Sequence, residues 1–163
     1  MQRYTGVNTI GLCHSVQVCS EGLLKGLGME DKLEGCKELT SISLPSTINE
    51  IDDRAFAYCL MLESITIPAG VTEISTSTFE GCSALNNVIL PGTINEIDAL
   101  AFRNCNTLQN IYCAATTPPR IAANSFENIA ASAVIYVPTN SVTTYQNAAN
   151  WSAYASQIVG YEF

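Results

Sequence analysis

The sequence predicts a leucine-rich repeat solenoid, mainly β, with short irregular return segments and helical N- and C-terminal caps. Two observations carry this prediction. Cysteine recurs every 23 residues, and an apolar pattern, L-x-x-I-x-(L/I)-P, repeats in phase with it. A fixed step of about 20–29 residues with this leucine pattern is typical of a solenoid. The length of 163 residues suits one domain.

The apolar residues keep the same step through the repeat. We call the residues at one position of successive units a column. In the fourth unit Ile121 and Phe126 recover the pattern after one inserted residue near Pro118-Pro119. The main columns are Cys36, Cys59, Cys82, Cys105; Leu39, Leu62, Leu85, Leu108; Ile42, Ile65, Val88, Ile111; Leu44, Ile67, Leu90, Cys113; Ile51, Ile74, Ile97; and Phe56, Phe79, Phe102.

Each L-x-x-I-x-(L/I)-P stretch predicts a short strand that ends at its proline. Alternate residues of a strand face opposite ways, so we expect Ile42 and Leu44 to point inward while Ser41 and Ser43 point outward. The stretch I-N-E-I-x-x-x-A-F then returns the chain with further inward apolar groups. One unit cannot bury these groups alone, so the units must stack about 4.7–4.9 Å apart.

The cysteine column permits two interpretations. Neighbouring cysteines lie one strand spacing apart, a distance that allows disulfides. We expect free, buried thiols instead, because cysteine packs well as a small interior residue. Redox or metal chemistry is the alternative, although no pair has zinc-finger spacing. Since the chain has seven cysteines, they cannot all pair within a monomer.

The units resemble the BspA-like class of bacterial and protist leucine-rich repeats. The matching segments are LTSISLPSTINEIDDRAFAYC, LESITIPAGVTEISTSTFEGC and LNNVILPGTINEIDALAFRNC, with Thr78 in place of an alanine. The resemblance predicts four repeats over residues 36–128. It also implies a surface-exposed or secreted module that binds other proteins or carbohydrate.

Residues 129–163 predict a C-terminal cap made of a strand and a helix. The run from Ala133 to Pro138 predicts the strand, and Thr139-Asn140-Ser141 offers side-chain oxygens for a helix start. This segment is similar to the closing segment of many BspA-like proteins. The predicted apolar helix face comprises Val142, Tyr145, Ala149 and Trp151.

Residues 1–35 do not follow the repeat and form an N-terminal cap or a fusion segment. A helix carrying Leu23, Leu24 and Leu27 is one possibility. The segment TIGLCHSVQ instead resembles a motif of family-four glycoside hydrolases, which depend on NAD and manganese. That resemblance implies a metal-binding role for Cys13, beside His14, and makes a remnant or regulatory piece of such an enzyme the alternative function.

Catalytic chemistry finds little support in the residues. His14 is the only histidine, and no glycine-rich dinucleotide loop follows a strand. A single Cys-His pair supplies fewer ligands than a catalytic metal site takes, and no serine triad can be assembled. We therefore predict no enzyme activity, no catalytic residue, no bound metal and no cofactor.

The charge and composition exclude several partner classes. The net charge is −8, so binding to nucleic acid or anionic lipid is not expected. Hydrophobic residues make up 47% of the chain and charged residues 13%, which argues against disorder. No apolar run reaches the roughly 18 residues of a membrane span, and the N-terminus lacks the apolar core of a secretory signal. We expect a cell-surface or secreted location if a signal peptide is missing from this chain, and otherwise a cytoplasmic one.

One column of the return segments is acidic. Glu50, Glu73 and Glu96 share a position, and Arg120 takes it in the fourth unit. Stacked like charges should raise one another's pKa. Calcium could relieve this repulsion through oxygen ligands, but we expect a solvated convex face that ends at Arg120.

The outward columns of the predicted sheet form the candidate binding surface, on the concave face. Hydroxyl groups dominate the early units, whereas amides and larger side chains gather in the late ones. Amides beside an aromatic ring suit a sugar or a peptide edge, although an ordinary polar sheet surface is the alternative. The predicted function is a non-catalytic module that presents this face to a protein or glycan. The candidate residues are Ser64, Thr66, Asn87, Ile89, Asn110 and Tyr112.

Overall fold

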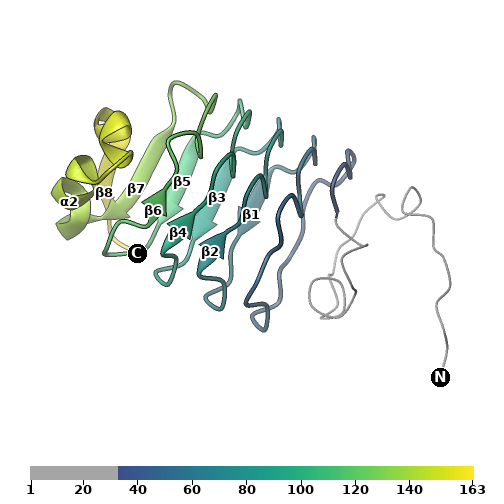
Figure 1. Ribbon diagram of the computed structural model, residues 1–163, viewed down its shortest axis with the longest axis horizontal. Helices are drawn as coiled ribbons and strands as arrows, with labels where there is room; N and C mark the ends of the chain where they lie inside the picture. The colour runs from purple at the N-terminus through teal and green to yellow at the C-terminus, as the bar shows by residue number, and fades with distance from the viewer. Residues whose placement is uncertain (1–32) are drawn as a thin grey trace, which may run out of the picture.

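The computed structural model describes residues 33–163, which form a solenoid of stacked layers along one long axis (Figure 1). Successive units lie side by side in sequence order, and the C-terminal helices lie at one end of the row (Figure 1). The predicted Cys13–His14 site and the predicted helix with Leu23, Leu24 and Leu27 lie outside the described residues.

The first halves of the units form one parallel sheet of five strands, in the order β1-β3-β5-β7-β8. Its register aligns the apolar column Ile65, Val88, Ile111 and Ile135 across four strands. This register confirms the 23-residue step and the single insertion in the fourth unit. The strands are β1 (Ser64–Thr66), β3 (Asn87–Leu90), β5 (Asn110–Cys113), β7 (Val134–Pro138) and β8 (Ile158–Tyr161).

The return segments are more regular than the sequence predicts. They contain a second parallel sheet, whose strands are β2 (Glu73–Ile74), β4 (Glu96–Ile97) and β6 (Arg120–Ile121). Each strand places its isoleucine in the core and its charged residue at the surface. Stacking identical returns brings their backbone groups into register, so the prediction of irregular returns is wrong at these positions.

The first unit does not form its predicted strand. Residues 39–45 are irregular, although the carbonyl of Thr40 still accepts a hydrogen bond from the amide of Glu63. Ser41 and Ser43 point outward as expected, while Ile42 and Leu44 are only partly buried. This unit therefore covers the edge of β1 without extending the regular sheet.

The core is a set of continuous apolar stacks. Phe56, Phe79, Phe102 and Phe126 stack with ring centroids 5.3 Å apart and nearly parallel planes. All four rings are fully buried or nearly so. Because each ring packs between its neighbours, one layer alone could not provide this environment.

The cysteine column bonds successive layers together. The Sγ atoms of Cys82 and Cys105 each donate to the carbonyl of the phenylalanine in the preceding unit at 3.1 Å. The Sγ atom of Cys59 donates at 3.2 Å to the carbonyl of Leu33, which takes the equivalent position. These three thiols and Cys113 are free and buried, as predicted. The prediction is wrong for Cys36, which is disulfide-bonded. The described cysteines other than Cys36 are all free, and spacing alone does not reveal which cysteine pairs with which.

The turn after each phenylalanine requires a left-handed backbone. Gly35 and Gly81 have positive φ there, and Asn104 and Asn128 adopt the same conformation. Glycine and asparagine tolerate this region best. Tyr58 occupies the position in the first unit, and its ring lies where a side chain at Gly81 would have to fit.

The C-terminal segment closes the end of the core. After β7 come the 3-10 helix η2 (Thr139–Ser141), helix α2 (Val142–Asn147) and the 3-10 helix η3 (Trp151–Gln157). Tyr145 and Trp151 are fully buried, and the Trp151 indole N–H donates to the Pro119 carbonyl at 2.7 Å. The Ser141 hydroxyl does not cap α2 as predicted, because it donates to the carbonyl of Thr116.

Candidate functional site

The structure brings the sequence-predicted site residues together on the outer face of the five-stranded sheet. Ser64, Asn87 and Asn110 align in one row across β1, β3 and β5, and the Asn110 amide donates to the Asn87 side-chain oxygen at 2.8 Å. Thr66, Ile89 and Tyr112 form the parallel row. That this face is concave stays a prediction.

An aromatic cluster extends the second row toward the C-terminus. The Tyr112 and Tyr136 rings stack with centroids 4.5 Å apart and planes 9° apart. The Tyr161 ring meets both edge-on, at 5.4 and 5.6 Å, and Phe163 meets Tyr161 edge-on at 5.0 Å. We call these four residues the tyrosine cluster.

The strands around the tyrosine cluster are apolar and uncharged, and the nearby Glu162 carboxylate accepts a hydrogen bond from the Thr139 hydroxyl. Ile89 and Val159 flank it on β3 and β8, with 44% and 39% of their surfaces exposed. No charged residue occurs in any of the five strands of this sheet. Tyrosines that expose edges and hydroxyl groups around apolar side chains are typical of protein-binding surfaces.

The ring geometry limits how a ligand can contact the cluster. Because Tyr112 and Tyr136 stack on one another, each ring covers one face of the other. Ring edges and hydroxyl groups therefore form much of the accessible surface, which suits hydrogen bonding and apolar contact. A sugar has fewer free ring faces on which to stack than the sequence suggests for Tyr112 alone.

Four residues of this surface are not among the candidates that the sequence predicts, namely Tyr136, Val159, Tyr161 and Phe163. A signal for Tyr136 was present, since it follows Tyr112 by one unit plus the inserted residue. The alternation in VIYVP also turns its side chain outward. No periodic signal identifies β8, because its sequence IVGY follows a non-repeating helical segment.

The acidic column lies on the second sheet, away from the cluster. Glu73, Glu96 and Arg120 are direct neighbours in the register of β2, β4 and β6, and Arg120 forms an ion pair with Glu96. Burial raises the pKa of Glu73, and the charges of Asp98 and Glu96 raise it further. Burial and the charge of Glu96 likewise raise the pKa of Asp98. Arg120 thus ends the column as expected.

A ladder of alternating charges runs along the turns of the units. Arg54 pairs with Glu34 at 2.5 Å and with Glu80 at 3.8 Å. Arg103 pairs with Glu80 at 3.8 Å and with Glu127 at 3.2 Å. Each carboxylate thus faces at least one guanidinium from a neighbouring unit, so the ladder joins layers and offers little free charge to a ligand.

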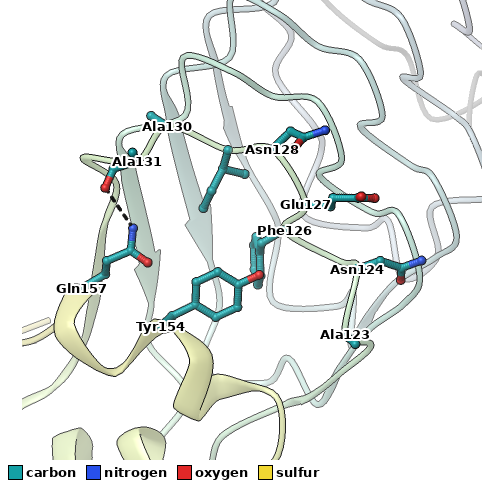
Figure 2. A pocket seen from close by; sticks show the side chains of 10 residues that line it. Ala123, Asn124, Phe126, Glu127, Asn128, Ala130, Ala131, Tyr154 and Gln157 are labelled. Atoms are coloured by element: carbon teal, nitrogen blue, oxygen red, sulfur yellow. Dashed lines mark hydrogen bonds between the residues drawn. The ribbon is translucent and has the colours of Figure 1, made fainter.

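A hollow of about 440 Å³ lies between the fourth return segment and η3, and Figure 2 shows the side chains that line it. Its volume falls within the range of small-molecule sites. The Tyr154 ring lies within it, edge-on to Phe126 at 5.8 Å. The polar ends of Asn124, Glu127 and Asn128 point away from the Tyr154 ring (Figure 2), so no set of polar groups converges on a ligand position.

The buried thiols are used for packing. Burial raises the pKa of Cys59 and Cys105 to about 12, which leaves almost no thiolate at neutral pH. Cys113 lies 3.3 Å from the Tyr145 hydroxyl, which in turn donates to the Ala115 carbonyl at 2.7 Å. Within residues 33–163, no group of three or more His, Cys, Asp or Glu side chains could hold a metal ion.

The stacked layers and their uncharged outer sheet define the protein as a leucine-rich repeat module. Its sequence matches the family described as BspA type leucine rich repeat region in six copies over residues 30–154. The chain therefore belongs to this family. The match extends beyond the four units of the column pattern at both ends, consistent with β7 continuing the sheet register.

A second similarity is short. The chain is 70% identical over 30 residues to a protein named alpha-galactosidase from Bacillus subtilis (strain 168). The matched segment makes up 18% of this chain and spans only 7% of that protein. Among the described residues, no helix is long and apolar enough to cross a membrane.

Proposed function

We propose that the chain is a non-catalytic binding module that presents the outer face of its five-stranded sheet to a protein or glycan at a bacterial cell surface. The observation that carries this proposal is the tyrosine cluster beside Ile89 and the amides of Asn87 and Asn110. Folding gains little from leaving aromatic rings partly exposed, whereas binding gains from rigid aromatic anchors.

The strands that carry this surface favour tight binding. The side chains stand on hydrogen-bonded strands whose inward neighbours, such as Val88 and Ile111, are fully buried. Little additional ordering of the protein is needed when a partner docks. Repeat modules commonly bind through surfaces shared by several layers. The net charge of −8 favours neutral or cationic partners.

A screen of the whole chain against arrayed matrix proteins and glycans tests the proposal. Any partner is then titrated against wild type, Tyr112→Ala and, as a matched control on the other sheet, Glu73→Gln. We expect Tyr112→Ala to weaken binding by more than about 1 kcal/mol and Glu73→Gln to leave it unchanged. Equal affinities for all three proteins would reject the tyrosine cluster as the contact surface.

A second candidate function rests on the alpha-galactosidase match alone. A remnant or regulatory piece of a metal- and NAD-dependent glycoside hydrolase would use Cys13 and His14, outside the described residues. Hydrolysis of aryl α-galactosides with NAD and Mn²⁺ tests it. Turnover that is lost in Cys13→Ala would support this candidate and contradict the non-catalytic proposal.

A further inference from the structure

Strand β8 leaves one edge of the five-stranded sheet open. It is the last strand in the sheet order and pairs only with β7. Within residues 33–163, no backbone hydrogen bond from outside the β7–β8 pair reaches it. Gly160 is exposed at the centre of the strand, and Thr139 of η2 packs against the face of this glycine on which a side chain would stand. The opposite end of the sheet differs, because the first unit covers β1 through the Thr40 carbonyl.

The open edge lacks the features that usually prevent strands from associating. Natural edge strands carry lysine, proline or inward-pointing charges that block pairing. The sequence of β8, Ile158–Tyr161, has no charge and no proline. Val159 and Tyr161, on the outer face, are 39% and 43% exposed. The nearest carboxylate, Glu162, accepts a hydrogen bond from the Thr139 hydroxyl.

We propose that β8 pairs antiparallel with β8 of a second copy of this chain, about a two-fold axis. The strand is complementary to itself. In antiparallel pairing, directly opposite residues lie on the same face of the sheet. A register centred on Gly160 therefore places Val159 opposite Tyr161 of the second copy, twice by symmetry. Aromatic and β-branched side chains are a favourable cross-strand pair, and glycine opposite glycine permits close approach.

The net charge opposes self-association in general, but least at the uncharged β8 strand. Each chain carries a net charge of −8, so two copies repel at most surfaces. The neighbouring carboxylates of Glu73 and Glu96 lie on the second sheet. Glu34 and Glu127 lie at the turns, where each forms an ion pair with an arginine. The β8 edge brings no like-charged side chains of its strands together. A two-fold contact of this kind closes on itself and gives a dimer rather than a fibre.

The dimer would join the two five-stranded sheets into one continuous sheet. Both tyrosine clusters would then lie near the two-fold axis, on the same face. A partner with repeated epitopes could contact both clusters, which raises its apparent affinity without new contacts. Self-association itself does not depend on the proposed binding function, so either can fail without the other.

Sedimentation velocity over about 5–500 µM chain tests the proposal, because dimer formation follows mass action. We expect the wild-type chain to shift from monomer to dimer, and more readily in about 0.5 M than in 0.05 M NaCl, since salt screens the net repulsion. Val159→Lys should raise the dissociation constant at least about tenfold by blocking the edge. Thr47→Lys, the same charge change in an exposed turn of the first unit at the opposite end of the solenoid, should not. A wild-type chain that stays monomeric throughout overturns the proposal.

Two further measurements locate the contact. Hydrogen exchange of the wild-type chain should slow at β8 amides as concentration rises, which needs no variant to fold. Ile89→Ala should still dimerise, because Ile89 lies on β3, three strands away from β8. A dimer that survives Val159→Lys, or one that Ile89→Ala abolishes, would show that copies meet elsewhere and would overturn edge pairing.

Discussion

The molecule contains two ladders of aromatic rings that run along the same axis and differ in exposure. Phe56, Phe79, Phe102 and Phe126 stack inside the solenoid, where the rings are 0–2% exposed. The tyrosine cluster stacks on the outer sheet face, where Tyr161 and Phe163 are 43% and 57% exposed. Every unit of the repeat contributes to the first ladder, but only the last strands contribute to the second.

This difference separates stability from function. An interior column must be filled in each layer, because a gap would leave a cavity between two rigid neighbours. An outward column has no such requirement, so hydroxyl groups can replace aromatic rings in it. Packing therefore does not require the change from Thr66 to Ile89 to Tyr112 and Tyr136 along one row, and this is why we propose a binding role for it.

The largest expected effect is on the interior ladder. Phe79→Ala should lower the free energy of unfolding by about 3–5 kcal/mol, because the ring packs between two others and the cavity cannot collapse. Ile89→Ala, a comparable apolar truncation on the exposed face, should cost less than about 1 kcal/mol. Denaturant titrations of both variants measure this. Similar losses would remove the distinction between the two ladders.

The cysteine column gives a chemical test of interior packing. With a pKa of about 12, Cys59 and Cys105 have a thiolate fraction of about 10⁻⁴ at pH 8, against about a quarter for a free thiol. Labelling by a disulfide reagent should therefore be slowed more than about a thousandfold in the folded chain. Mass spectrometry of labelled peptides, with and without denaturant, measures each site. Rapid labelling of folded Cys82 would show that the layers open readily.

The sequence predicted the interior almost completely and the outer face only in part. Columns such as Cys59, Cys82 and Cys105 repeat because every layer must fill the same interior position. The spacing alone therefore predicts that these residues lie in the core. The short strands β2, β4 and β6 escaped prediction because two-residue strands form from stacking rather than from local propensity. The column predicts a free thiol at Cys36, but this cysteine is disulfide-bonded. The spacing of cysteines does not reveal which of them form disulfides.

The candidate site depended on contacts that no local pattern shows. The repeat predicts the two rows of candidate residues on the sheet, and the strand register has both. The rows are Ser64, Asn87, Asn110 and Thr66, Ile89, Tyr112. Tyr161 and Phe163 join Tyr112 only because β8 returns parallel to β7 after a helical excursion. Such a return is a tertiary arrangement, which the 23-residue period does not determine.

Substitutions in the row of ion pairs along the turns should lower the free energy of unfolding by an intermediate amount, because these side chains are only partly exposed. The Glu80 side chain is 9% exposed and faces Arg54 and Arg103. Glu80→Gln should cost about 0.5–1 kcal/mol, since two guanidinium groups lose a shared counter-charge. Glu127→Gln, whose side chain is 47% exposed and pairs with Arg103, should cost less. Thermal unfolding at low salt measures both, and a larger loss for Glu127→Gln would contradict this ranking.

The smallest expected effect is on the acidic column, where a substitution should raise the free energy of unfolding instead of lowering it. The folded pKa of Glu73 is raised, so the folded state binds its proton more tightly than the unfolded chain does. Its ionised form is therefore destabilising above the folded pKa, and this penalty disappears as pH falls below about 4.5. Glu73→Gln should stabilise the fold at pH 7 by about 0.2–0.5 kcal/mol after solvent screening.

Melting temperatures of wild type and Glu73→Gln between about pH 3.5 and about pH 7, a range that spans the carboxyl titration, measure this. The two curves should converge at the acidic end. A variant that is less stable than wild type at pH 7 would mean that Glu73 has a favourable role which the repulsion from Asp98 and Glu96 does not explain.

The most direct test of the division between interior and outer face is one titration series. A partner recovered from the protein and glycan screen is titrated by calorimetry against wild type, Tyr112→Ala and Glu73→Gln, each first shown to be folded. We predict at least about a fivefold weaker affinity for Tyr112→Ala, which corresponds to about 1 kcal/mol, and unchanged affinity for Glu73→Gln. Lost affinity in Glu73→Gln with full affinity in Tyr112→Ala would contradict the account and place the binding surface on the second sheet.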